Sequence, residues 1–241
     1  MKTIVAIVIC LCSIAQVQAQ YIFTGKIEYE RKKNIHGLYK DEEWFDKYKA
    51  TTQKFLVNYF DLSFDTTRTC YKPGKEGDAA TSWMAQAPAM DNTVYTDFTA
   101  GRVKANKTVY EQKFLVDDST RKLAWKEKDE LRIILGHQCH KAVSIICDSV
   151  YVVAFYTEDI PVSGGPELFG GLPGMILELA IPRLHTTWTA TKIDQTPPVD
   201  ADYKIPEKGK KTTQKELLET VKDSFNDWGS SGKRNILWTV L

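Results

Sequence analysis

The residues best suited to chemistry in this sequence are the histidines and the cysteine of the stretch HQCH. His137, Cys139 and His140 carry side chains that bind zinc or copper well. In an extended strand His137 and Cys139 share one face, whereas His140 points to the other. Further ligands would have to come from distant residues: His36, His185 or Cys70. We therefore expect no metal and no other cofactor, with a metal-handling protein as the alternative function.

Other residues that could take part in catalysis form no recognisable constellation. Glu158 and Asp159 are adjacent carboxylates, but neighbouring residues of a strand face opposite ways, so we expect solvated charges at the start of a loop. Ser163 is not surrounded by the G-x-S-x-G pattern of a nucleophile elbow. The sequence therefore favours a non-catalytic protein, and a hydrolase with an unrecognised site is a second alternative.

The stretch EDIPVSGGPELFGGLPGMILEL, residues 158–179, concentrates glycine and proline before a hydrophobic run. It lacks the Gly-Lys-Ser/Thr ending of a phosphate-binding loop and precedes an expected strand, where a phosphate loop precedes a helix. Gly171 and Gly174 permit a positive φ, and Pro173 fixes its own φ. These residues predict a stiff, tight bend that leads into a buried strand.

The approach to this bend carries side chains that can make contacts. Ser163, Glu167 and Phe169 supply a hydroxyl, a carboxylate and an aromatic ring. Loops usually run over the surface, where such groups are accessible. The sequence therefore places any binding surface on an exposed segment, PVSGGPELF, residues 161–169.

The first nineteen residues, MKTIVAIVICLCSIAQVQA, have the features of a secretory signal peptide. Lys2 precedes a short apolar core, and Val17 and Ala19 are the small residues expected before a cleavage site. Cleavage after Ala19 predicts an exported protein in the periplasm, at the outer-membrane periphery or outside the cell. The rest divides into a β-rich domain, residues 20–200, and a polar linker with a helix and tail, residues 201–241.

The charge of the chain argues against two classes of partner. Without Lys2 the sequence carries 31 basic and 31 acidic residues, so it has no electrostatic preference for nucleic acid or for an anionic membrane. After the signal segment, no stretch is apolar and long enough to cross a bilayer, which predicts that the protein is not an integral membrane protein.

The cysteines of the exported chain are Cys70, Cys139 and Cys147. An odd number leaves at least one unpaired within a monomer. Cys139 and Cys147 are expected at the two ends of one strand, about 26 Å apart, too far for a disulfide. A bridge would require Cys70 with one of the other two, or a break in that strand, and we favour free thiols that are partly buried.

Alternating apolar and polar residues dominate the chain and predict a β-rich fold. The clearest hairpin joins two β-branched runs across Asp148 and Ser149, and MILELAIP is expected as the strand that follows the bend. One helix is expected in TTQKELLETVKDSFNDWG, residues 212–229, because Thr213 and Glu216 form a capping box. Gly229 is expected to end the helix. One apolar stripe is expected along it, formed by Leu218, Val221, Phe225 and Trp228.

Several segments resemble the GLPGLI family, an exported family of Bacteroidota named for its motif. IPVSGGPELFGGLPGMILEL is the most specific segment, and LGHQCHKA and AFYTEDIP resemble elements that precede the motif in that family. Met175 stands where leucine is more usual. The resemblance implies that the family motif loop of this chain consists of these residues: Pro161, Ser163, Gly165, Pro166, Phe169, Gly171, Leu172, Pro173 and Gly174.

The resemblance implies an exported protein and brings no established activity. We predict a mainly β (β-rich α+β) fold, a curved antiparallel sheet with a C-terminal helix, similar to the half-barrels of periplasmic lipoprotein carriers. The favoured function is a non-catalytic periplasmic binding protein or outer-membrane accessory protein. Its expected partner is an apolar ligand or an outer-membrane protein.

Overall fold

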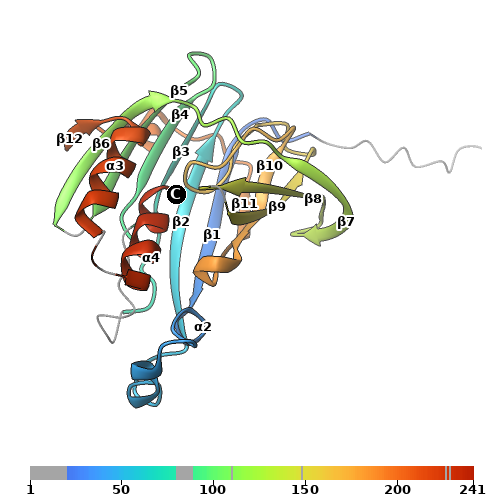
Figure 1. Ribbon diagram of the computed structural model, residues 1–241. Coiled ribbons are helices and arrows are strands. Elements are labelled where there is room, and N and C mark those ends of the chain that lie inside the picture. The colour runs from blue at the N-terminus through green and yellow to red at the C-terminus, as the bar shows by residue number, and fades with distance from the viewer. Residues whose placement is uncertain (1–20, 80–88, 110, 148, 226, 228) are drawn as a thin grey trace, which may run out of the picture.

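The computed structural model describes residues 21–79, 89–109, 111–147, 149–225, 227 and 229–241 (Figure 1). The predicted signal segment, residues 1–19, lies outside the described residues. Among the described helices, none combines the length and the apolar character that a membrane span requires.

The described residues form one sheet of twelve strands in the order β12-β6-β5-β4-β3-β2-β1-β11-β10-β9-β8-β7. Neighbours pair antiparallel, except that β12 runs parallel to β6. This confirms the predicted mainly β fold. The strands are β1 (Gly25–Asn34), β2 (Phe55–Phe64), β3 (Arg68–Pro73), β4 (Thr93–Asp97), β5 (Arg102–Val109), β6 (Gln112–Ser119), β7 (Lys126–Ile134), β8 (His137–Ile146), β9 (Val150–Thr157), β10 (Met175–Ile181), β11 (Thr186–Asp194) and β12 (Lys210–Thr212).

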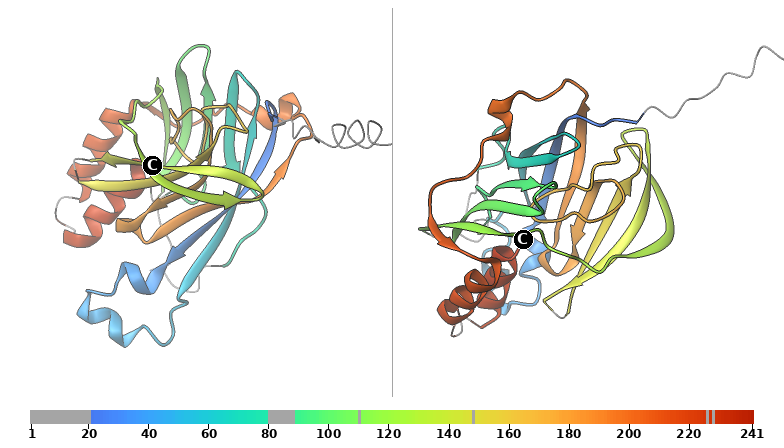
Figure 2. Two further views of the ribbon diagram at one scale, coloured as in Figure 1. Left: turned by 90° about the vertical axis from the view of Figure 1, so that its right-hand side faces the viewer. Right: turned by 90° about the horizontal axis from the view of Figure 1, so that it is seen from above.

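The sheet curves strongly, so that the part built from β3–β6 faces the part built from β8–β10 (Figure 2). The main hydrophobic core lies between them and contains residues of both parts, including Val103, Val116, Val152 and Ala154. The two C-terminal helices lie against the inner side of the curve (Figure 1). Trp238 of the second helix is buried beside Trp188 of β11, with 6.2 Å between ring centroids.

The C-terminal segment forms two helices where one was predicted. The predicted capping box is present, with Thr213 N donating to Glu216 Oε2 at 2.9 Å and Glu216 N donating to Thr213 Oγ1 at 3.2 Å. Helix α3 (Gln214–Phe225) buries Leu217 in place of the predicted Leu218, and Gly229 begins α4 (Gly229–Thr239). The predicted Trp228 lies outside the described residues.

The predicted hairpin is formed by β8 and β9, although Asp148 of its turn is not described. Cys139 lies in β8 and Cys147 follows the last residue of that strand. The three described cysteines are not joined by disulfides. This agrees with the prediction that Cys139 and Cys147 do not bond to each other. Burial raises the pKa of Cys70 to about 11 and that of Cys139 to about 12, whereas Cys147 is exposed.

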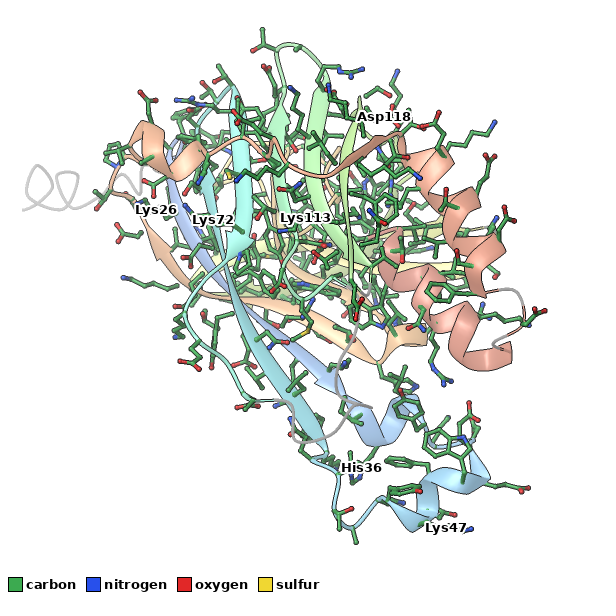
Figure 3. The ribbon with its side chains drawn as sticks, turned by 90° about the vertical axis from the view of Figure 1, so that its left-hand side faces the viewer. Lys26, His36, Lys47, Lys72, Lys113 and Asp118 are labelled. Atoms are coloured by element: carbon green, nitrogen blue, oxygen red, sulfur yellow. The ribbon has the colours of Figure 1, made fainter. Side chains whose placement is uncertain are left out.

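A small extension projects from one end of β1 and β2 and has its own apolar cluster (Figure 1). It contains α2 (Ile35–Leu38) and the 3₁₀ helix η1 (Glu43–Lys47). His36 lies in this extension, at one end of the molecule (Figure 3). Two further 3₁₀ turns, η3 (Pro182–Leu184) and η4 (Asp200–Tyr203), connect strands.

Candidate functional site

The motif loop between β9 and β10 folds into the curve of the sheet. Glu167 and Phe169 are each only 3% exposed, so the prediction of an exposed binding segment is wrong for both. Ser163 is half-buried, while three of the motif residues are exposed: Pro161, Gly171 and Pro173. The other motif residues are buried: Gly165, Pro166, Leu172 and Gly174.

Backbone and side-chain hydrogen bonds hold the loop in this inward position. Ile176 N donates to the carbonyl of Gly164 at 3.0 Å, and Gly171 N donates to Ser163 Oγ at 3.0 Å. The indole of Trp125, outside the loop, donates to the carbonyl of Gly170 at 2.8 Å. These hydrogen bonds give polar groups of the loop backbone a partner. A segment that is removed from water needs such partners.

The tight bend at GLPG is present, but its glycines have different roles. Gly171 has φ +87°, in the left-handed region that favours glycine. Gly174 does not have a positive φ, so that expectation is wrong for it. A Cβ at Gly174 would instead lie 2.0 Å from the carbonyl oxygen of Thr157. Close backbone approach is therefore the reason for glycine at position 174.

Glu167 is the charged residue that the loop carries into the interior. Its φ is +55°, which is uncommon for a residue with a side chain. Asn92 Nδ2 donates to one carboxylate oxygen at 2.7 Å, and Tyr71 OH donates to the other at 3.5 Å. Arg31 Nη1 lies 3.9 Å from the same oxygen as Tyr71. These contacts come from β1, from β3 and from the connection that leads into β4, and they fix the carboxylate in place.

Among the described residues, three basic side chains are buried on the inner side of the sheet: Arg31, Lys33 and Lys107. Arg31 donates to the carbonyl of Ala89 at 2.6 Å and to Asn58 Oδ1 at 3.0 Å. Lys107 donates to the carbonyl of Thr239 at 3.1 Å and to a backbone oxygen of Leu241. Backbone oxygens therefore hold much of this buried positive charge.

Burial sets the protonation of this cluster. Desolvation raises the pKa of Glu167, although Lys107 and Arg31 oppose the shift. Desolvation lowers the pKa of Lys107 to about 7, and it lowers that of Lys33 to about 7 with the help of Arg31. Perturbed groups of this kind cluster at functional sites, although buried ion networks show the same behaviour.

These shifts predict how stability depends on pH. Between about pH 7 and 9.5 the unfolded chain keeps Lys107 protonated while the folded chain loses the proton, so the free energy of unfolding rises with pH. We expect Lys107→Met to reduce that rise by about 1 kcal/mol per pH unit. Urea unfolding at pH 7, 8 and 9 measures it. The matched control is Lys113→Met, at an exposed lysine of β6, which should leave the slope unchanged. Equal slopes for wild type and Lys107→Met would contradict the prediction.

A cavity of about 310 Å³ lies beside the loop. Its lining includes Thr69 of β3, Thr96 of β4 and Val103 of β5, which are successive cross-strand neighbours. The loop contributes residues 163–165 and 167–171, including Glu167 and Phe169. Residues 120–123 belong to the connection from β6 to β7 and also line the cavity, as do Phe98 and Gly101 between β4 and β5. The cavity therefore combines hydroxyls, backbone and charged groups in one place.

The HQCH residues make ordinary structural contacts. His137 Nδ1 lies 2.8 Å from Asp159 Oδ2, and the ring of His140 packs against Tyr156 with 5.8 Å between centroids. Cys139 is buried. In the part of the chain that the structure describes, no three histidine, cysteine or acidic side chains come together as a metal site.

Sequence reasoning missed the buried cations, although a signal for them exists. In β1 the buried positions alternate through Ile27, Tyr29, Arg31 and Lys33, so the two basic residues share the phase of the apolar face. In β5 the buried set includes Lys107 in the same way. A basic residue in phase with a buried face marks a candidate interior charge.

Comparison with known proteins places the chain near a family without an assigned function. Residues 84–178, which include the motif loop, match a family described as "Protein of unknown function (Porph_ging)". No curated protein matches the chain. The GLPGLI assignment therefore stays a prediction.

Two solved structures of PNGF-II, in space groups C2 and P21, are similar to this chain. Each has a TM-score of 0.53, with 16% and 19% sequence identity respectively. They cover 86% of this chain, but only 33% and 34% of PNGF-II, so the chain spans about a third of its length. At such low identity the likeness concerns the fold alone.

Proposed function

We propose that this chain is an exported, non-catalytic binding protein of the GLPGLI type that holds a small polar molecule under its motif loop. The observation that carries the proposal is the cavity of about 310 Å³ between the loop and β3–β5. Its volume is at the lower end of the range for small-molecule sites. Its residues come from three distant parts of the chain, so ligand binding would join the loop to the sheet.

A polar ligand fits this cavity better than the apolar ligand expected from the sequence. The inner side of the curved sheet is filled by packed side chains, including Trp188 and Trp238. The hydroxyls of Thr69, Thr96 and Ser163 belong to residues that line the remaining space. Export to the periplasm or the outer-membrane periphery is part of the proposal and rests on residues 1–19.

A hydrolase finds less support in the same cavity. Glu167 is the single carboxyl residue among the described residues that line it, and no histidine joins it there. Both oxygens of Glu167 are held by Asn92 and Tyr71. General acid–base catalysis needs a titratable group within reach of substrate, usually with a second group in a complementary role.

The proposal is tested by filling the cavity and measuring what the protein retains. Native mass spectrometry of the protein purified from its own cells should show a bound small molecule. Thr96→Trp, which places an indole in the cavity, should be purified without the bound molecule. Thr191→Trp, at an exposed position of β11, is the matched control and should keep it. A ligand retained by Thr96→Trp, or wild-type protein without a bound molecule, would contradict the proposal.

A further inference from the structure

The cavity beside the motif loop contains a guanidinium group that forms no ion pair with an acidic side chain of the described residues. Arg121 lies in the connection between β6 and β7 and lines the cavity. Its Nε donates to Gln214 Oε1 at 3.2 Å, and its Nη2 donates to the carbonyl of Val240. Both acceptors are neutral, and within the described ranges Arg121 forms no ion pair with an acidic residue.

The nearby carboxylates are engaged elsewhere. Asp118, the acidic residue nearest to Arg121 along the chain, accepts from Gln214 N at 3.0 Å and from Ser119 N at 2.7 Å. Figure 3 shows Asp118 beside the start of α3. Glu167 also lines the cavity, but its oxygens are directed to Asn92, Tyr71 and Arg31. Neither acidic group forms an ion pair with Arg121.

The environment of Arg121 favours an anion. Arg121 is half-buried, and burial lowers its pKa, yet a guanidinium stays charged in proteins, so a partly desolvated positive charge remains in the wall of the cavity. Charges removed from water are normally paired. Nη1 has no hydrogen-bond partner among the described residues, and the guanidinium lies 5.9 Å from the ring centre of Phe169. Lys122 also lines the cavity and adds positive charge.

We propose that Arg121 is the anion-binding residue of this cavity and that the ligand carries a carboxylate or a phosphate group. The planar guanidinium matches both groups through paired N–H donors. The threonines at positions 69, 96 and 120 line the same space and supply hydroxyls for the rest of the molecule. The inference rests on the proposed function and specifies the chemistry of its ligand.

Thermal melting of the full exported chain tests this with two defined probes, sodium phosphate and sodium acetate, each at 50 mM. Sodium chloride at equal ionic strength is the reference. We expect at least one probe to raise the wild-type Tm by roughly 3–6 °C. Arg121→Met should lose this shift and Arg121→Lys should keep part of it. Arg183→Met, which removes an exposed arginine of η3, is the matched control and should respond as wild type does.

Each outcome decides the inference. A wild-type Tm that neither probe raises, or an equal shift in Arg121→Met, would overturn it. If Arg121→Met does not fold, Thr96→Trp decides, because it keeps Arg121 but fills the cavity and should lose the shift. A neutral molecule found by native mass spectrometry would overturn the anion assignment and leave the proposed binding function intact. Acetate and phosphate, compared separately, identify the anionic group.

Discussion

Gly174→Ala is expected to lower the free energy of unfolding by at least about 3 kcal/mol, at the upper end of the cost of overpacking. A Cβ at this position would lie 2.0 Å from the carbonyl oxygen of Thr157 and 3.1 Å from Cα of Glu158. Both contacts are backbone atoms, which cannot turn away as a flexible side chain does. Relief would require β10 to separate from β9, where Met175 pairs with Thr157. Urea unfolding monitored by tryptophan fluorescence measures the loss.

The matched control for this change is Gly171→Ala in the same GLPG bend. Gly171 has a positive φ, but among the described residues the one atom within 4 Å of its Cβ position is Trp125 Nε1, at 3.9 Å. Its substitution therefore costs only the strain of a left-handed residue, roughly 1–2 kcal/mol. A Gly174→Ala protein as stable as Gly171→Ala would show that close approach is not what requires glycine at position 174.

Glu167→Leu is expected to cost about 3–5 kcal/mol at pH 7, the usual loss when one member of a buried ion pair is removed. Within the described part of the chain, Glu167 is the one carboxylate within 4.0 Å of Arg31. Its loss leaves that guanidinium buried in the company of Lys33 and Lys107. Glu167→Gln is the matched control, because it keeps the shape and the contacts to Asn92 and should cost less than half as much.

A double-mutant cycle separates the charge from the packing. Arg31→Met removes the positive partner, and Glu167→Leu combined with Arg31→Met should recover at least about 1 kcal/mol of the summed single losses. Equilibrium unfolding in urea gives all four free energies. Full additivity of the two losses would contradict the ion pair, and a Glu167→Leu protein within about 0.5 kcal/mol of wild type would show that the carboxylate is not needed for stability.

The sequence by itself determined the local features of this protein. Alternation of apolar residues predicted the strands, the capping box of Thr213 and Glu216 predicted the start of α3, and the glycine at position 171 predicted the bend. These features depend on dihedral preferences and hydrogen bonds between residues a few positions apart. Such interactions can be evaluated in a short window of sequence.

The tertiary structure alone decided where the loop goes and which charges it meets. Glu167 contacts Asn92, Tyr71 and Arg31, which are distant in sequence and belong to different parts of the sheet or its connections. The sequence indicated an exposed loop, because segments that connect strands usually run over the surface. The curve of the sheet instead encloses the loop, and burial then compels the carboxylate to find partners. Curvature and long-range pairing sum many weak contacts across the whole sheet, so no local pattern encodes the site.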